Sequence, residues 1–204
     1  MNRKILKWED CTFYLFNNVY EPAEDTFLLA ENLDIKPGDV VLDMGTGCGI
    51  LAVLSASKAE RVVALDINPH AVRCAKSNGR VNGVSEKMDV IRGNLFKPIK
   101  EDETFDLILF NAPYLPVEEN ERTDWIDYAW VGGEKGRTVI DRFISSAPRY
   151  LKASGRILLV QSTLSNVDET IEKLNEQGLN ASIQDEKKVA FETITLIKAE
   201  KRDS

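Results

Sequence analysis

The sequence contains few of the side chains from which metal sites and histidine-based catalysts are built. Its 204 residues include one histidine, His70, and three cysteines, Cys11, Cys48 and Cys74. None of the cysteines stands in a C-x-x-C pair, the spacing that zinc sites commonly use. These counts argue against a disulfide framework, a metal centre and a catalytic triad that depends on histidine.

Long apolar runs and a surplus of basic residues are also absent. No stretch of about 18 uncharged apolar residues could form a transmembrane helix, and charged residues stand on both sides of Trp8, where a signal peptide would be apolar. The net charge is −7, whereas a protein that grips a DNA duplex usually presents a basic face. We therefore expect a cytoplasmic protein, with no membrane contact and no strong nucleic-acid signal, that acts on a protein or a small molecule.

No repeat, low-complexity tract or Pro/Gly/Ser-rich linker divides the chain. Apolar residues make up 43% of it and charged residues 29%, as in globular proteins. We expect one domain over residues 1–204, in which residues 1–35, with a helix at 23–32, cover the ligand site of a core formed by residues 36–204.

Apolar runs rich in β-branched residues alternate with segments of helical pattern. After β-like pieces at 12–20, we expect strands at 39–44, 61–67, 87–92, 105–110 and 156–161, a closing pair of strands within 181–198, and helices at 50–58, 69–82, 134–151 and 167–177. This alternation predicts an α/β fold with a doubly wound, mostly parallel sheet of about seven strands and a terminal antiparallel hairpin. The pattern alone fits many α/β enzymes.

A glycine-rich loop follows the first predicted core strand, in Asp43-Met44-Gly45-Thr46-Gly47-Cys48-Gly49. Glycines such as Gly45 and Gly47 let a backbone turn sharply and approach a ligand closely. The dinucleotide fingerprint is G-x-G-x-x-G, but here the third glycine comes one residue early. Asp43 suits the ammonium group of S-adenosylmethionine, whereas it would repel a pyrophosphate. The loop therefore predicts S-adenosylmethionine rather than NAD as the cofactor.

Two further strand ends carry candidate cofactor ligands. Asp66 follows the second core strand, where a carboxylate accepts hydrogen bonds from a ribose diol; the alternative is that Asp66 or Asn68 only caps the next helix. Asn94, flanked by Leu95, follows the third strand, where an adenine amino group would be read. Taken alone, Asn94 would be a turn residue.

The fourth core strand ends in Asn111-Ala112-Pro113-Tyr114. An amide nitrogen is a poor nucleophile, and two acceptors that hold its N–H groups orient it toward a methyl donor and offset the charge that builds up. The tetrapeptide resembles the Asn-Pro-Pro-Tyr motif of methyltransferases that act on planar nitrogens. The resemblance implies catalytic roles for Asn111, Pro113 and Tyr114. It also implies that Asn111 and the carbonyl of Ala112 bind the substrate NH2 group while Tyr114 packs on its plane.

Ala112 departs from the motif, which usually has proline at this position. Alanine still supplies the backbone carbonyl, and Pro113 still disfavours helical backbone at Ala112. We therefore expect activity to persist with some loss of rigidity.

Two more segments narrow the resemblance: residues 19–27, Val-Tyr-Glu-Pro-Ala-Glu-Asp-Thr-Phe, and residues 129–137, Ala-Trp-Val-Gly-Gly-Glu-Lys-Gly-Arg. With the tetrapeptide, they resemble the short HemK-related glutamine methyltransferases of archaea and eukaryotes, which are Rossmann-like class I enzymes. The resemblance implies that the following residues contact the cofactor, as their counterparts in the family do: Thr26, Asp43, Gly45, Asp66, Asn94, Leu95 and Asn111.

The same resemblance implies a substrate and a partner. The substrate would be the glutamine in the Gly-Gly-Gln loop of a class I translation release factor. The partner would be a small zinc-binding activator subunit that adds itself to an open sheet edge, here the strand at 87–92.

Other interpretations stay open. The same tetrapeptide serves adenine N6-methyltransferases, and methylation of lysine or of a small amine, or a scaffold that binds the donor without catalysis, are further alternatives. The acidic stretch 118–127 is either a lid over the cleft or a solvated loop, and Trp8 and Trp125 are expected in the core or on a partner surface.

Overall fold

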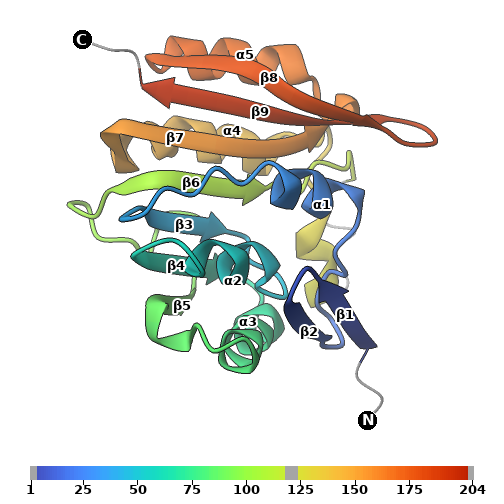
Figure 1. Cartoon of the computed structure of the whole chain (residues 1–204). Coiled ribbons are helices and arrows are strands. Elements are labelled where there is room, and N and C mark those ends of the chain that lie inside the picture. Colours follow the sequence, from blue (N-terminus) through green and yellow to red (C-terminus); the bar gives the residue numbers. More distant parts are fainter. Residues whose placement is uncertain (1–3, 118–123, 202–204) are drawn as a thin grey trace.

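The computed structural model describes residues 4–117 and 124–201. A seven-stranded sheet runs through its centre in the order β5-β4-β3-β6-β7-β9-β8 (Figure 1). Strands β5, β4, β3, β6 and β7 are parallel, and β9 is antiparallel to both of its neighbours. The strands span β3 Val40–Met44, β4 Arg61–Asp66, β5 Met88–Arg92, β6 Phe105–Asn111, β7 Leu151–Ser162, β8 Leu179–Lys188 and β9 Thr193–Lys201. This confirms the predicted doubly wound, mostly parallel sheet with a terminal antiparallel hairpin.

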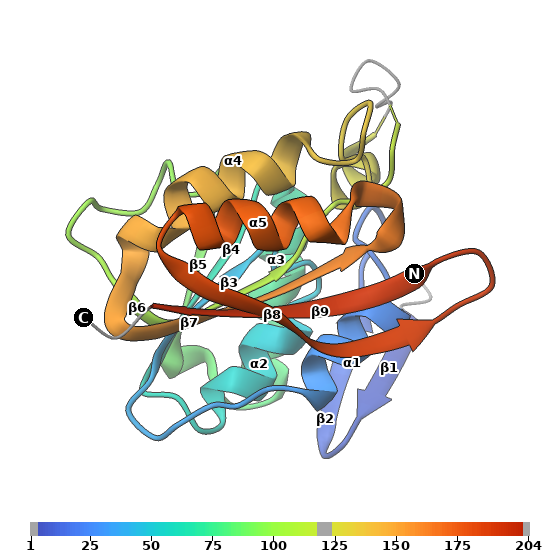
Figure 2. The ribbon, with the colours of Figure 1, turned by 90° about the horizontal axis from the view of Figure 1, so that it is seen from above.

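Helices cover both faces of the sheet. Figure 2 shows α4 and α5 on one face and α1, α2 and α3 on the other. The helices span α1 Glu24–Glu31, α2 Ile50–Ala56, α3 Pro69–Val81, α4 Thr138–Ser146 and α5 Val167–Glu176. Because each face is covered, the central strands are apolar on both sides; in β4 every residue after Arg61 is buried. Among the described residues, no helix is long and apolar enough to cross a membrane.

Local chemistry fixes where α3 begins and ends. The side chain of Asn68 accepts a hydrogen bond from the backbone N–H of His70 at 2.8 Å, and Pro69 occupies the first helical position. Gly83 lies just past the end of the helix with a φ of +71°, a left-handed conformation that glycine adopts without strain.

The N-terminal residues form a small hairpin that packs on α3. Strand β1, Lys4–Trp8, pairs with β2, Cys11–Leu15. Two asparagines one turn apart on α3, Asn78 and Asn82, exchange hydrogen bonds with the backbone of Tyr14 and Thr12 as a neighbouring strand would. Only β2 lies within the β-like segment predicted at 12–20, and β1 was not predicted.

The helix predicted at 134–151 is too long at both ends. Helix α4 covers only Thr138–Ser146, a 3-10 turn follows at Ala147–Tyr150, and β7 already begins at Leu151. Gly133 and Gly136 hold left-handed backbone, with φ of +89° and +68°, which delays the start of the helix. Pro148 lies within the 3-10 turn, where α-helical continuation is disfavoured.

The order of the strands brings the loops that follow four of them together at the carboxyl ends of the sheet. Strand β3 lies between β4 and β6, and the chain crosses from one side of β3 to the other at this point. In open α/β sheets, ligands bind at the carboxyl ends of the strands beside such a switch point. The loops that follow β3, β4, β5 and β6 all begin there.

Candidate functional site

A cavity of about 1110 Å³, part of it open to solvent, lies at the carboxyl ends of these four strands. Concave, partly open pockets of this kind are where small-molecule ligands bind. The walls of the cavity come from the N-terminal segment, the glycine loop, the ends of β4 to β6, helix α4 and a short 3-10 turn, η3, at Trp125–Ala129. The residues from these elements that the next paragraphs discuss are Tyr20, Thr26, Gly45, Gly47, Asp66, Asn94, Leu95, Asn111, Pro113, Trp125, Tyr128 and Arg142.

The glycine loop is held in a conformation that only glycine adopts easily. Gly45, Gly47 and Gly49 have φ of +70°, +56° and +87°. A Cβ on Gly49 would come within 2.9 Å of the backbone of Ala75 in α3, so this glycine also permits close helix packing. The backbone N–H of Thr46 donates to the carbonyl of Leu65 at 2.9 Å and fixes the loop against β4.

Asp66 lies where its carboxylate meets both the loop and the cavity. It accepts hydrogen bonds from the backbone N–H of Gly47 at 2.9 Å and of Asn68 at 2.8 Å. Burial raises the pKa of Asp66 to about 6, against the lowering effect of these backbone donors. Asn68, and not Asp66, is the side chain that caps α3, so the carboxylate of Asp66 is not used as a helix cap.

Asp43 is fully buried and does not line the cavity. Its Oδ2 accepts a hydrogen bond from the hydroxyl of Thr46 at 2.6 Å, and its Oδ1 has no partner within the described chain. Burial raises the pKa of Asp43 to about 7, with a smaller raising effect from the charge of Asp66. A direct contact between Asp43 and a ligand's ammonium group stays a prediction.

Asn94 and Leu95 both line the cavity after β5. The Oδ1 of Asn94 accepts a hydrogen bond from Arg142 of α4 at 3.2 Å. Leu95 has a φ of +49°, a left-handed conformation that is unusual for a residue with a Cβ. The backbone here is thus held in a strained form at the wall of the cavity.

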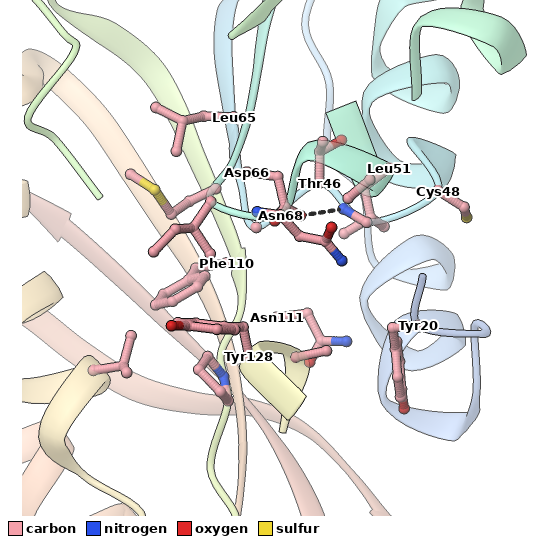
Figure 3. A pocket seen from close by; sticks show the side chains of 18 of the residues that line it. Tyr20, Thr46, Cys48, Leu51, Leu65, Asp66, Asn68, Phe110, Asn111 and Tyr128 are labelled. Atoms are coloured by element: carbon pink, nitrogen blue, oxygen red, sulfur yellow. Dashed lines mark hydrogen bonds between the residues drawn. The ribbon is translucent and has the colours of Figure 1, made fainter. Parts of the chain in front are cut away.

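Asn111 ends β6 with its side-chain amide oriented by the N-terminal segment. Its Nδ2 donates to Oγ1 of Thr26 at 3.2 Å, while its Oδ1 is buried without a partner in the described part of the chain. Figure 3 shows Asn111 and Phe110 of β6 and Asp66 of β4, the two strands on either side of β3, facing the same space as Tyr20. A buried carbonyl oxygen without a donor is costly, and it marks a position where a ligand N–H would be accepted.

The three residues that follow Asn111 in the tetrapeptide differ in whether they line the cavity. Pro113 lines the cavity, but Ala112 and Tyr114 do not. The backbone N–H of Ala112 donates to the carbonyl of Val160 in β7 at 3.2 Å, a hydrogen bond that proline could not make. This bond restrains the peptide after Asn111 where the motif's usual proline is missing.

Tyr114 lies behind Asn111 and beside the N-terminal segment. Its hydroxyl donates to Asp25 at 3.4 Å, and Tyr20 donates to the same carboxylate at 3.0 and 3.1 Å. Burial, and then the charge of Asp25, raise the pKa of both tyrosines, so both hydroxyls stay protonated donors. The predicted packing of Tyr114 on a substrate plane stays a prediction.

Several cavity residues were not predicted from the sequence. Trp125 and Tyr128 stack on each other with ring centroids 5.4 Å apart in η3, and both line the cavity, although Trp125 was expected in the core or on a partner surface. Tyr20 stands in the quoted segment 19–27 and Arg142 lies five residues after the quoted segment 129–137, and that proximity was the available signal. Within the predicted acidic stretch, residues 118–123 lie outside the described residues.

No group of three or more histidine, cysteine, aspartate or glutamate side chains in the described ranges is arranged to hold a metal ion.

Comparisons with known proteins identify the family of the chain. A family model for ribosomal protein L11 methyltransferase (PrmA) matches residues 26–115, the segment from α1 through the tetrapeptide. The chain is 41% identical over 198 residues to a putative protein N5-glutamine methyltransferase of Methanocaldococcus jannaschii, covering 96% of this chain and 98% of that one. It is 32% identical to human methyltransferase HEMK2 and covers 90% of each.

A solved structure shares both the fold and part of the sequence. The Encephalitozoon cuniculi protein Mtq2, solved in complex with Trm112 and described as responsible for methylating the termination factor eRF1, superposes with a TM-score of 0.67 and 28% identity. The match covers 91% of this chain and 99% of that one. The strand order, the polar strand ends and these relatives together show that the chain is an enzyme of the HEMK-related protein N5-glutamine methyltransferase family.

Proposed function

We propose that this protein transfers a methyl group from S-adenosylmethionine to the side-chain nitrogen of the glutamine in the Gly-Gly-Gln loop of a class I release factor. The observation that carries the proposal is the buried Oδ1 of Asn111, which has no partner among the described residues. It lies at the wall of the cavity that the glycine loop and Asp66 form. The names of the relatives support the choice of glutamine over adenine or lysine, which share the chemistry of the site.

The residues around the cavity fit S-adenosylmethionine. Asp66 would accept the ribose hydroxyls, Gly45 and Gly47 would let the loop backbone approach the ligand, and Asn94 and Leu95 would flank the adenine. The cofactor supplies an electrophilic methyl group on a sulfonium.

Asp43 and Thr26 are the residues that we expect near the amino-acid part of the cofactor. The orphaned Oδ1 and raised pKa of Asp43 are those of a carboxylate that a nearby ammonium group would stabilise. Thr26 lines the cavity from α1, and with Tyr20 and Pro22 it would cover the bound ligands from the side of the N-terminal segment.

The chain's own part in the reaction is to hold the amide nitrogen. Oδ1 of Asn111 and the carbonyl of Ala112 would accept the two N–H groups of the substrate glutamine and turn its nitrogen toward the methyl donor. As the nitrogen becomes positive, the same oxygens stabilise the charge that develops. The methylated nitrogen is then a strong acid, so water takes its proton and the site needs no histidine.

We also propose that an activator subunit pairs with the exposed edge of β5. This strand is the outermost of the parallel strands, as predicted, and an open edge offers unpaired backbone groups. Arg92, the last residue of β5, lies 5.4 Å from the centre of the Trp125 ring, so a partner on this edge would be next to the cavity wall. Because its substrate is a translation factor, we place the protein in the cytoplasm.

The test is transfer of labelled methyl groups to the cognate release factor with and without the activator subunit. We expect labelling of the wild-type factor, no labelling of a factor whose Gly-Gly-Gln glutamine is changed to alanine, and a loss of about 100-fold or more in rate for Asn111→Ala. Asn111→Ala should still bind S-adenosylhomocysteine. Equal labelling of both release factors, or of DNA and RNA oligonucleotides at the same rate, would refute the proposal.

A further inference from the structure

The amide of Asn111 would work only in one of its two orientations. With Oδ1 toward the substrate, the side chain accepts a substrate N–H; turned over, it would present its own NH2 group to the substrate's NH2 group. The structure has Nδ2 directed away from the cavity, toward Thr26. The orientation of the Asn111 amide depends on which neighbouring groups can donate a hydrogen bond and which can only accept one.

The hydroxyl of Thr26 has its single hydrogen already engaged. Its Oγ1 donates to Oδ1 of Asp25 at 3.1 Å, and the backbone N–H of Thr26 donates to the same oxygen. The hydroxyl therefore has only lone pairs left for Asn111, and these attract Nδ2 and repel Oδ1. A carboxylate offers only acceptor oxygens, so Asp25 supplies no hydrogen in return.

The carboxylate of Asp25 is itself placed by four donors. Besides the two groups of Thr26, the hydroxyls of Tyr20 and Tyr114 point at it, and only 5% of the residue is exposed. Both tyrosines stay protonated because their pKa values are raised by burial and by the charge of Asp25. The carboxylate thus joins Asn111, through Thr26, to Tyr114 of the same tetrapeptide.

We propose that Asp25 and Thr26 are positioning residues for the reaction, which fix the Asn111 amide with Oδ1 toward the substrate through the chain Asp25–Thr26–Asn111. This role rests on the proposed function and adds to the contact with the cofactor that the family resemblance implies for Thr26. The two roles differ in what they predict. A cofactor contact changes the affinity for the cofactor, whereas a positioning residue changes kcat at saturating cofactor.

The kinetic test compares Thr26→Val, which keeps the shape and removes the hydroxyl, with Thr26→Ser, which restores it. We expect Thr26→Val to lower kcat at saturating cofactor about 10- to 100-fold, a loss that a change in the Kd for S-adenosylhomocysteine does not account for, and Thr26→Ser to recover most of the rate. Asp25→Ala should lower kcat at least as much, and the double variant Asp25→Ala with Thr26→Val should be little worse than the poorer single variant, because both break one chain. An unchanged kcat in Thr26→Val, or additive losses, would overturn the proposal.

A second measurement does not depend on the substrate. The side-chain NH2 group of Asn111, assigned in ¹⁵N spectra by its loss in Asn111→Ala, should shift in Thr26→Val and keep its position in Thr26→Ser. Thr46→Val is the matched control, since it removes another threonine–aspartate hydrogen bond of the same cavity, to Asp43, and should leave the Asn111 signal in place. If the wild-type enzyme fails to methylate the release factor, the proposed function fails, and these spectra still decide whether Thr26 orients Asn111. An Asn111 signal that does not respond to Thr26→Val would refute the inference.

Discussion

If the carboxylate of Asp66 binds the cofactor's ribose as proposed, cofactor binding should depend on pH. Burial raises the pKa of Asp66 to about 6 in the free protein. Ribose hydroxyls that donate to the carboxylate favour its charged form, so the pKa falls when the cofactor binds. Below about pH 6 the protein must therefore release a proton from Asp66 to bind the ligand. We expect the Kd for S-adenosylhomocysteine to increase as the pH falls below 6, by up to about tenfold per pH unit. Above pH 6 the contribution of Asp66 should be flat.

Calorimetry between about pH 5 and pH 8 measures this dependence, with Asp66→Asn as the comparison. The variant should bind more weakly at every pH and lose the step near pH 6. Asp43, whose pKa burial raises to about 7, would contribute a separate step, and Asp66→Asn should move that step to lower pH because the charge of Asp66 is one cause of the rise. A step near pH 6 that persists in Asp66→Asn would assign the titration to another group.

At the same scale, some site residues were predictable from the sequence and others were not. Asp66, Asn94 and Asn111 each follow an apolar strand, and the carboxyl ends of parallel strands meet at one edge, so their convergence could be expected. Asp25 and Tyr20 meet Tyr114 only because the N-terminal segment folds back across the tetrapeptide. Nothing in the spacing of residues 90 positions apart indicates such a contact.

The connection at residues 130–137, between η3 and α4, supports the tetrapeptide from outside the cavity. The backbone N–H of Leu115 donates to the carbonyl of Trp130 at 2.8 Å, and that of Gly132 donates to the carbonyl of Leu115 at 2.9 Å. Gly136 has a φ of +68°, and a Cβ on it would lie 2.2 Å from the carbonyl oxygen of Tyr114. Buried Arg137 ties the end of the connection to α5 by donating to the carbonyl of Asn166 and the hydroxyl of Thr170.

We expect Gly136→Ala to disturb the tetrapeptide as well as the stability of the fold. The left-handed conformation costs an alanine about 1–2 kcal/mol, and the contact with Tyr114 adds a displacement that should lower the methyl-transfer rate more than about tenfold. Gly83→Ala is the matched control, because Gly83 has a φ of +71° and no described atom within 4 Å of the position of its Cβ. Thermal melts and initial rates of both variants check this; equal activity losses would show that only backbone strain matters.

The same connection shows why element boundaries were harder to predict than elements. The helical pattern from residue 134 is real in α4, but Gly133 and Gly136 hold left-handed backbone at places where a Cβ would meet Thr138 and the carbonyl of Tyr114. By contrast, α3 carries its own signals in Asn68, Pro69 and Gly83, and it spans Pro69–Val81 against the predicted 69–82.

At the scale of the whole molecule, the N-terminal segment can form a wall of the cavity only if it is attached to the sheet. One buried side chain near the amino end of the sheet makes the connection: Arg156 of β7 donates to the carbonyl of Asp34 and forms an ion pair with Asp39 at 2.9 Å. Both charged side chains are almost fully buried, at 4% and 8% exposure. Topology was predictable from the alternation of strands and helices, whereas this pairing across 117 residues was not.

Removal of Arg156 should therefore destabilise the protein more than removal of a surface arginine that pairs with two carboxylates. In Arg156→Met the carboxylate of Asp39 stays buried with only the backbone N–H of Lys36 as a described donor, and we expect a loss of about 3–5 kcal/mol in the free energy of unfolding. Arg61 pairs with Asp89 and Glu103, but its side chain is 41% exposed, so Arg61→Met should cost about 1 kcal/mol or less. Adding Asp39→Asn to Arg156→Met should cost less than the single changes summed, because no buried charge is then left alone. Urea unfolding of the four variants measures these differences, and similar losses for Arg156→Met and Arg61→Met would mean that burial does not strengthen the pair.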